Sequence, residues 1–307
     1  MKILITGVSG QLGQHLLLKK PSKINSEEIN IICTSKKELD LSKESACREL
    51  IFKINPDWVI NCGAYTSVDK AESEKEIAYL INGKGPYFLA KYLSEIGGKL
   101  LHISTDFVFD GKNNEAYEIN HPLNPINHYG KSKALAEKLL ISENNFANIY
   151  VLRTSWVLSN LGKNFFLTIL NLLSKKDAIH VVNDQIGCIT SAGNLAELCW
   201  KIIKTENNGV VIPKILHFSD SGICNWFDVA SAIYEFSKKK KLITKKTEII
   251  PVKSEFFNLP AKRPKFSLLN SQPTYNLFNF YPMHWRNSLE SLLDSLDKEY
   301  LKNFKNK

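Results

Sequence analysis

The sequence of 307 residues has few cysteines and no long apolar run, and each shortage excludes a class of protein. Its six cysteines are scattered without a CxxC pair or a metal-ligand spacing, which excludes a disulfide framework and indicates reduced thiols. No apolar run is long enough to cross a bilayer, and a strand-like run begins at residue 2, so we expect no membrane span and no signal peptide. These features predict a cytoplasmic protein.

Acidic residues are fewer than basic ones, 31 against 40, which gives a net charge of +9. Lysines gather at 238–241 and 245–246, but no aromatic residues alternate with them as a platform for single-stranded nucleic acid requires. We therefore interpret the cluster as a solvated helix end and expect no nucleic-acid partner. A diffuse positive field also suits an anionic nucleotide as substrate.

Short apolar runs alternate with amphipathic segments in the first half of the chain. We expect strands at 2–6, 29–33, 58–61, 99–104 and 149–153, and helices at 42–53, 74–96 and 129–142. Repeated β–α units predict a doubly wound, Rossmann-like parallel sheet with helices on both faces. Ligands bind at the carboxyl ends of such strands, so the segments that follow the strands are candidates for the site.

The second half is less regular and predicts a smaller, mostly helical lobe. Helix-like segments at 165–173, 195–203, 226–236 and 288–296 are separated by loops rich in Asn, Ser and Pro. We place a nucleotide-binding domain at 1–158 and a substrate-binding lobe at 159–307. A strand and helix near 179–204 are candidates to return to the main sheet.

A glycine-rich loop follows the first strand directly. Gly7, Gly10 and Gly13 have GxxGxxG spacing, and a helix-like segment follows them. Glycines allow a tight turn and a close approach of backbone to a pyrophosphate, while the new helix directs its amide groups at the anion. An ordinary strand-to-helix turn is the alternative. The position directly after a strand favours a phosphate cradle, with Gln11 and Leu12 between the glycines.

Tyr129 and Lys133 are the most informative pair in the chain. Their i, i+4 spacing places both side chains on one face of a helix, within reach of one site. A Tyr hydroxyl, with a pKa of about 10, transfers protons poorly near neutral pH until a nearby cation lowers that pKa. The YxxxK pattern alone also fits a chance surface pair. Its place downstream of the glycine loop is the order that a short-chain dehydrogenase/reductase requires.

Several further segments resemble the dTDP-4-dehydrorhamnose reductase family, which belongs to the extended short-chain dehydrogenase/reductases. They are TGVSGQLG (6–13), NCGAYTSVDKAE (61–72), INGKGP (81–86), HISTDFVFDG (102–111), YGKSK (129–133), RTSWV (153–157), KNFF (163–166), VNDQIG (182–187) and PAKRPKFS (260–267). The glycine loop and YxxxK identify only the superfamily, whereas the combination of the other segments is more specific.

The resemblance implies an NADPH-dependent reduction of the C4 carbonyl of dTDP-4-dehydro-L-rhamnose to dTDP-L-rhamnose, for surface polysaccharide. Tyr129 would donate the proton to the forming alkoxide. Lys133 would hold the nicotinamide ribose and lower the pKa of Tyr129. Thr105 would hydrogen-bond the carbonyl oxygen. A strand-end Thr that satisfies backbone groups is the alternative for Thr105.

The resemblance also implies a set of sugar and phosphate contacts. Asp106 would orient the sugar, or cap the next turn, and Trp156 would pack on the sugar, or lie in the core. Arg263 would pair with a phosphate, for which its guanidinium is suited, or stay a surface residue. The other implied substrate positions are Phe107, Asn164, Asp184 and Gln185. For the three polar residues among them, capping of a loop is the alternative role.

The residues after the second strand favour NADPH, with NADH as the alternative. Ser35, Lys36 and Lys37 precede the first carboxylate, Glu38, and cations accommodate a 2′-phosphate. The resemblance places further positions along the cofactor, together with Tyr129 and Lys133: Asp40, Leu41, Asn61, Gly63, Ala64 and Tyr65.

Some positions depart from the family pattern. Phe107 stands where tyrosine is common, which removes a hydroxyl near the sugar. In some members of the family, glutamates hold a magnesium ion between two subunits. His15 and Gly193 stand at the matching positions here, so we expect no metal site. For the assembly we expect either a monomer or a homodimer. A reductase or epimerase for another nucleotide sugar, or a non-catalytic nucleotide-binding regulatory subunit, are the alternative functions.

Overall fold

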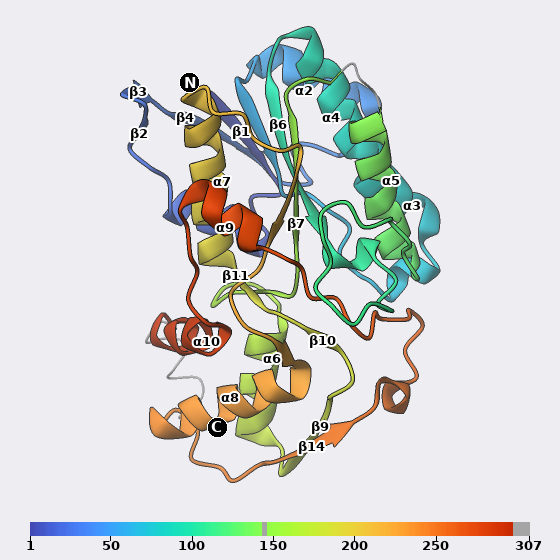
Figure 1. The fold of residues 1–307 in the computed structure, drawn as a ribbon, viewed down its shortest axis with the longest axis vertical. Helices are drawn as coiled ribbons and strands as arrows, with labels where there is room; N and C mark the ends of the chain where they lie inside the picture. The colour runs from blue at the N-terminus through green and yellow to red at the C-terminus, as the bar shows by residue number, and fades with distance from the viewer. Residues whose placement is uncertain (143–145, 297–307) are drawn as a thin grey trace.

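The computed structural model describes residues 1–142 and 146–296, and its central element is a six-stranded sheet (Figure 1). All neighbouring strands in it are parallel. Their order across the sheet is β12 (Ile215–Phe218), β7 (Ile149–Thr154), β6 (Lys99–Thr105), β5 (Trp58–Asn61), β1 (Lys2–Thr6) and β4 (Asn30–Thr34). A change of direction in the strand order falls beside β1, where open α/β sheets place a ligand crevice.

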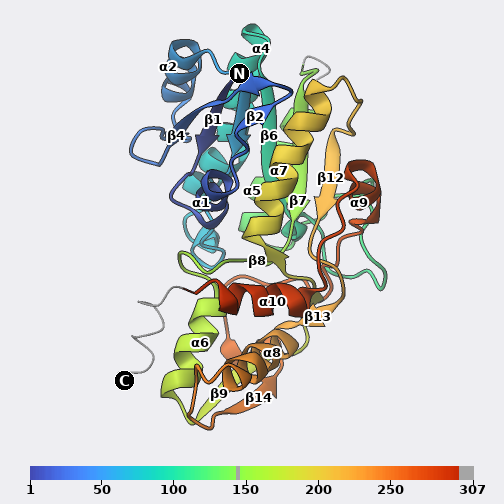
Figure 2. The same cartoon turned by 90° about the vertical axis from the view of Figure 1, so that its left-hand side faces the viewer.

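Helices cover both faces of the sheet because the apolar residues of each strand alternate between the faces. Ile3 and Ile5 pack with α1 (Gln11–Leu18) and α7 (Ala192–Asn207), which lie in front of the sheet in Figure 2. Leu4 points to the other face, whose core includes residues of α2 (Glu44–Ile54), α4 (Gly85–Glu95) and α5 (His128–Ser142).

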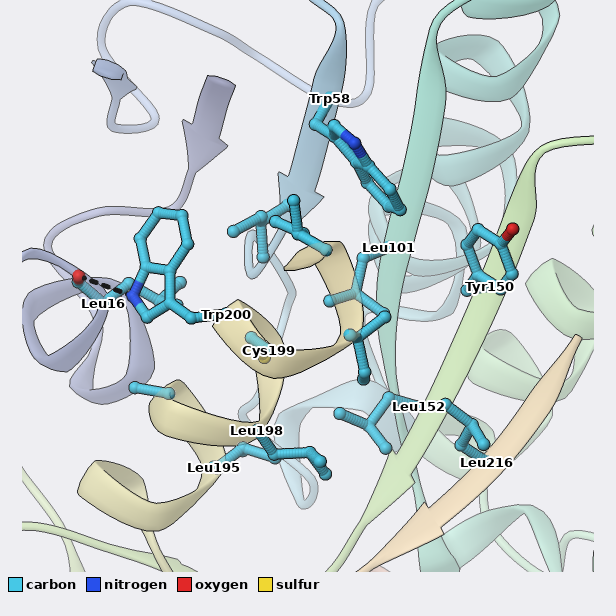
Figure 3. Packing of buried hydrophobic residues seen from close by; sticks show 14 of the residues in the cluster. Leu16, Trp58, Leu101, Tyr150, Leu152, Leu195, Leu198, Cys199, Trp200 and Leu216 are labelled. Carbon is cyan, nitrogen blue, oxygen red and sulfur yellow. Dashed lines mark hydrogen bonds between the residues drawn. The ribbon is translucent and has the colours of Figure 1, made fainter. Parts of the chain in front are cut away.

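The core under α1 and α7 is built from large side chains (Figure 3). Trp200 of α7 is 5% exposed and donates a hydrogen bond from Nε1 to the Leu16 carbonyl at 3.1 Å, which ties α7 to α1. Trp58 and Tyr150, of the same cluster, stack with their ring centroids 5.8 Å apart and donate hydrogen bonds to Asn207 and Glu206 at the carboxyl end of α7. These contacts fix α1, and with it the glycine loop that precedes α1.

A second core lies in a smaller lobe below the sheet in Figure 1. It contains buried residues of α6 (Phe165–Lys175), α8 (Trp226–Lys239) and α10 (Trp285–Asp294). The strands β9 (Ala178–Val182) and β14 (Glu248–Val252) pair in parallel on this lobe. Asn225 begins α8 with a capping box, since its side chain accepts from the Asp228 amide and Asp228 accepts from the Asn225 amide.

The remaining elements are short. Three two-stranded pairs are β8 (Val157–Leu158) with β11 (Thr190–Ser191), β10 (Ile186–Gly187) with β13 (Cys224–Asn225), and β2 (Lys23–Ile24) with β3 (Glu27–Glu28). The other short helices and turns are η1 (Lys70–Glu72), α3 (Lys75–Tyr79), η2 (Leu80–Lys84), η3 (Asp106–Val108), η4 (Ser254–Phe257) and α9 (Gln272–Phe278).

The expected Rossmann-like class is confirmed, with differences in detail. The strand expected near 179 pairs with β14 in the lobe, whereas the helix that follows it, α7, packs beside α1 on the main sheet. The single helix expected at 74–96 is divided by a π-helical turn, η2. Strand β12, absent from the expected strands, extends the main sheet beside β7. The division of the chain at 158 stays a proposal. Within the described residues, no helix is both long and apolar enough to span a membrane.

Candidate active site

A cavity of about 560 Å³ lies at the carboxyl ends of the main strands, where an open α/β sheet places its ligands. The glycine loop, the ends of β4, β5 and β6, and the start of α5 line one part of it. Trp156 and Lys163, from the segment that leads into the smaller lobe, line another. The cavity therefore lies between the sheet and the lobe.

The glycine loop fits a cradle for an anion. Gly7 has φ of +65°, and a Cβ there would lie 2.7 Å from the Gly63 backbone. Both the backbone conformation and the lack of space therefore exclude a side chain at this position. A Cβ on Gly13 would lie 2.6 Å from the Gly7 carbonyl oxygen and from the Val8 Cα. Close packing of loop and helix thus directs the free amide groups of the first turn of α1 at the cavity.

The far end of the cavity is lined by Ser35, Lys36, Asp40 and Leu41. Ser35 donates from its amide and its hydroxyl to a Glu38 carboxylate oxygen, at 2.8 and 2.5 Å. These two bonds lower the pKa of Glu38, which therefore stays ionised near neutral pH. The turn that follows β4 therefore carries the Glu38 carboxylate and the Lys36 ammonium at this end of the cavity.

Tyr129 and Lys133 both line the cavity from one face of α5, as their spacing predicts. Burial raises the pKa of Tyr129 to about 12, while the neighbouring Thr105 hydroxyl acts in the opposite direction. This differs from the expectation that Lys133 lowers the pKa of the phenol, because desolvation dominates here. The phenol is therefore protonated near neutral pH, the form that a proton donor needs, and its raised pKa makes it a weaker acid.

Lys133 is a buried amine held at the sheet. Its Nζ donates to the Ile103 carbonyl at 2.6 Å and contacts His102 Nε2 at 3.2 Å. Burial lowers its pKa to about 8, an effect that the Glu137 carboxylate opposes. Burial and the Lys133 charge also lower the pKa of His102 well below its usual range, so the ring is neutral and can accept from the ammonium.

Thr105 and Asp106 follow β6 at the cavity wall. Thr105 Oγ1 accepts from the Phe107 amide at 3.2 Å and donates to Asp106 Oδ1 at 3.0 Å, so Thr105 caps the short helix η3. Burial raises the pKa of Asp106 to about 6. The Phe107 ring lies edge-on to the Tyr129 ring at 5.8 Å. Thr105 lines the cavity, whereas Asp106 and Phe107 support it from behind.

Trp156 lies on the lobe side of the cavity in a left-handed conformation, with φ of 48°. Its ring stacks on Trp226 with centroids 4.0 Å apart, and Phe165 lies 4.4 Å from the Trp226 ring. Non-glycine residues with positive φ cost free energy and gather at functional sites. The stacked pair therefore fixes the Trp156 ring at the cavity wall.

Besides Asp106 and Phe107, four more predicted substrate residues lie outside the cavity lining. Asn164 begins α6 and accepts from the Leu167 amide at 3.1 Å. Asp184 accepts from the amide and hydroxyl of Ser254, and Gln185 donates to that same hydroxyl at 2.9 Å. Arg263 forms a two-point ion pair with Asp69.

Two predicted cofactor residues also have structural partners. Asn61 is buried and accepts from the Thr6 hydroxyl at 2.6 Å. Tyr65 donates from its hydroxyl to Glu74, and its amide donates to Asn82 at 2.7 Å. Both residues shape the backbone on either side of Gly63 and Ala64, which line the cavity as predicted. The roles of all these residues stay predictions.

The cavity also contains residues that the sequence reasoning did not select, among them Ser104 and Lys163. Both lie within segments that carried the family resemblance, STD at 104–106 and KNFF at 163–166. The adjacency of Ser104 to Thr105 was the available signal. Other unselected lining residues are Thr6, Ser9, Leu39, Cys62, Thr66, Ile81, Ile103, Thr154, Val157, Gly162 and Leu195.

His15, which stands where some family members hold magnesium, contacts a serine hydroxyl instead. His15 Nε2 lies 2.9 Å from the Ser159 hydroxyl, and burial lowers the pKa of His15. In residues 1–142 and 146–296, no group of three or more His, Cys, Asp or Glu side chains is arranged to hold a metal ion. A dinucleotide suits the site better, because the glycine cradle and Lys36 at the far end of the cavity are complementary to phosphate groups.

Comparison with known proteins agrees with this geometry. The family model described as RmlD substrate binding domain matches residues 1–298. The chain is 37% identical to the spore coat polysaccharide biosynthesis protein SpsK of Bacillus subtilis, over 95% of this chain and 96% of that protein. It is 32% identical to the dTDP-4-dehydrorhamnose reductase of Aggregatibacter actinomycetemcomitans, over 95% and 98% of the two chains.

Solved structures extend the likeness to the fold. A dTDP-4-dehydrorhamnose reductase from Clostridium acetobutylicum is 34% identical, with a TM-score of 0.87 over 96% of this chain and 99% of that one. The Bacillus anthracis dTDP-4-dehydrorhamnose reductase, solved in complex with NADP, is 34% identical with a TM-score of 0.85 over 95% and 98%. The chain therefore belongs to the dTDP-4-dehydrorhamnose reductase family, the family of the RmlD substrate binding domain.

Proposed function

We propose that this protein reduces the C4 keto group of dTDP-4-dehydro-L-rhamnose to give dTDP-L-rhamnose, with NADPH as reductant. The observation that carries the proposal is that Thr105, Tyr129 and Lys133 line one cavity with the glycine loop. The names of the relatives support the choice of substrate, and the relative solved with NADP supports the choice of cofactor. The name of the spore coat relative supports a product that serves surface polysaccharide.

When bound, NADPH supplies the hydride that reduces C4. The protein then has to deliver one proton to the C4 oxygen, so that C=O becomes CH–OH. Tyr129 is the donor, because its phenol is protonated near neutral pH and lies beside Thr105. The Thr105 hydroxyl donates to the same oxygen as negative charge develops on it, which requires Thr105 to release Asp106 Oδ1.

Other residues bind and orient. The amides of the glycine loop receive the cofactor pyrophosphate, and Lys36 receives a 2′-phosphate. Lys133 holds the nicotinamide ribose through its ammonium. The Trp156 ring packs on the sugar from the lobe side and excludes water from the reacting carbonyl. Arg263 would exchange Asp69 for a substrate phosphate.

The assembly and the compartment belong to the proposal as well. The protein acts in the cytoplasm as a monomer or homodimer on a dTDP-sugar, without a nucleic-acid or membrane partner. Light scattering from a size-exclusion column decides between the two assemblies.

The test mixes purified protein with NADPH and dTDP-4-dehydro-L-rhamnose, generated in place by enzymes that make that sugar, and follows loss of reduced-nicotinamide absorbance. We expect oxidation of NADPH with dTDP-L-rhamnose as product. No oxidation by a protein that binds NADPH would contradict the proposal and favour another nucleotide sugar or a regulatory role.

A further inference from the structure

An ion pair is buried directly behind the cavity. Arg153 of β7 and Glu137 of α5 are 2% and 1% exposed at their side chains. Arg153 donates from Nε to Glu137 Oε1 at 3.1 Å and from Nη2 to Oε2 at 2.7 Å, a two-point contact of the strongest kind. Arg153 begins the RTSWV segment that carried the family resemblance, and the proposed reaction gives it no role.

Every remaining side of this pair is occupied. Arg153 Nη1 donates to the Ile119 carbonyl and to His217 Nε2, both at 3.0 Å, and the guanidinium lies over the Phe109 ring. The Ser104 hydroxyl donates to Glu137 Oε1 at 2.5 Å. Ser104 lines the cavity next to Thr105, so the pair contacts the cavity wall through one hydroxyl.

The helix α5 connects the pair to the proposed proton-transfer groups. Tyr129, Lys133 and Glu137 are spaced by four residues and share one face of α5. In the sheet, Ser104 and Arg153 lie opposite each other in the register of β6 and β7. The Ile103 carbonyl therefore holds Lys133 at the sheet, and Glu137 follows one turn later on the same helix face, where its charge acts on the ammonium.

The groups around Lys133 leave Glu137 as the carboxylate that acts on it. Cys62, from the end of β5, is neutral because burial raises its pKa to about 12. His102, from β6, and Tyr129, from α5 itself, are neutral near pH 7 because of the pKa shifts described above. Asp106 of η3 acts on Tyr129, whereas Glu137 acts on Lys133, and Arg153 from β7 opposes Glu137 from behind.

Fold stability alone is a poor explanation for such a pair. Desolvation of two charges offsets most of their attraction, so a buried ion pair contributes little compared with apolar residues of similar volume. Glu137 lies one helical turn from Lys133 on the same face of α5, whereas Arg153 comes from β7 and is bound to the Glu137 carboxylate. The two members therefore act on the ammonium with opposite signs.

We propose that Glu137 is the positioning counter-ion of Lys133 and that Arg153 sets the strength of this counter-ion, so that the pair keeps Lys133 charged at the site. The inference rests on the proposed function for the meaning of a charged Lys133, which holds the cofactor ribose. The electrostatic relationship itself belongs to the protein alone and is measurable without turnover.

The test follows the titration of Lys133 by NMR in protein carrying isotope-labelled lysine, with its signal identified by its loss in Lys133→Met. Glu137→Gln removes the anion and should move the Lys133 titration to lower pH by ~1–3 units. Arg153→Met removes the opposing cation and should move the titration to higher pH. The matched control is Glu44→Gln, which breaks an exposed ion pair with Lys91 and should leave Lys133 unchanged.

A second readout is the pH dependence of NADPH oxidation. Loss of the Lys133 charge as pH rises limits activity on the alkaline side, so this limb should move with the NMR titration, in opposite directions in the two variants. A purely structural role would lower the rate in both variants without opposite shifts. Shifts of equal sign, or none, would overturn the proposal.

A double variant allows the test to be made even if the single variants do not fold. Glu137→Gln with Arg153→Met leaves no uncompensated buried charge and is expected to fold more readily than either single change. In it, the Lys133 titration should lie below that of the unmodified protein. An unchanged titration would overturn the counter-ion role. If the NMR shifts are observed while no sugar is reduced, the proposed function fails and this inference stands.

Discussion

Arg263 and Asp69 join two segments 194 residues apart by a two-point ion pair, with Nη1–Oδ1 and Nη2–Oδ2 distances of 2.8 and 2.6 Å. Asp69 also accepts from the Ala261 amide at 3.2 Å, so its carboxylate orders the segment that carries Arg263. A guanidinium preorganised on one carboxylate is suited to receive a phosphate in the same geometry.

Replacement of Arg263 tests this interpretation. Arg263→Lys keeps the charge but loses the two-point geometry, which should weaken substrate binding by about 1.5–3 kcal/mol. The KM for the dTDP-sugar should rise ~10-fold to ~100-fold while the KM for NADPH stays unchanged. Steady-state kinetics with each substrate varied in turn provide the measurement. An unchanged KM for the sugar would show that Arg263 only supports the loop.

Tyr129 is the proposed proton donor, and Tyr129→Phe removes only its hydroxyl. We expect kcat to fall by a factor of ~10²–10⁴, the usual contribution of general acid catalysis. NADPH affinity, measured by fluorescence titration, should stay unchanged because the ring still packs beside Phe107. Tyr92→Phe is the matched control, since it removes a phenol hydroxyl that bonds Glu44 outside the cavity lining and should leave kcat unchanged. A Tyr129→Phe variant with near-normal turnover would assign the proton to another group.

Cofactor choice depends on the charges after β4. Replacement of Lys36 and Lys37 by Ala should raise the KM for NADPH by roughly tenfold and leave NADH unaffected, because only NADPH carries the 2′-phosphate. Glu38→Gln should act in the opposite direction, since it removes the carboxylate that now accepts from Ser35. Lys53→Ala, on the exposed end of α2, controls for overall charge. Equal changes for both cofactors would contradict the assignment.

His217 gives stability a dependence on pH. Burial lowers its pKa to about 3, whereas an unfolded histidine titrates near 6.5. Between these values the unfolded chain binds more protons than the folded protein, so the free energy of unfolding falls as pH drops from about 6.5 toward 3. His217→Gln keeps an acceptor for Arg153 and removes this titration.

Urea unfolding of both proteins at pH 7 and pH 5 isolates the contribution of His217. The unmodified protein should lose more stability between the two values than His217→Gln does. Because Asp106 is the same in both, its own titration cancels in this difference. Equal losses would show that His217 is not the neutral, buried group described here.

Local patterns predicted the parts of the site that are local in sequence. The glycine loop and the Tyr129–Lys133 pair are each set by a few adjacent residues, so their spacing and their order along the chain predicted their positions at the cavity. Strand β12 was absent from the expected strands, and it is defined by its pairing with β7. Pairing between distant segments is not visible in a single sequence.

The partners of charged side chains were the least predictable feature. The resemblance predicts a phosphate partner for Arg263, and nothing in its sequence neighbours indicates Asp69, because the two residues lie 194 positions apart in the chain. Arg153 was part of a recognised segment without a role, since Glu137 lies on a different element. The pKa of Tyr129 likewise depends on burial by surrounding elements, which outweighs the nearby cation.

The most direct test of the central claim traces the hydride and the proton separately. Purified protein, NADPH deuterated at the transferring position and dTDP-4-dehydro-L-rhamnose should give dTDP-L-rhamnose with deuterium on C4, and Tyr129→Phe should make this product far more slowly. Oxidation of NADPH without deuterium at C4, or no oxidation with this sugar, would contradict the account.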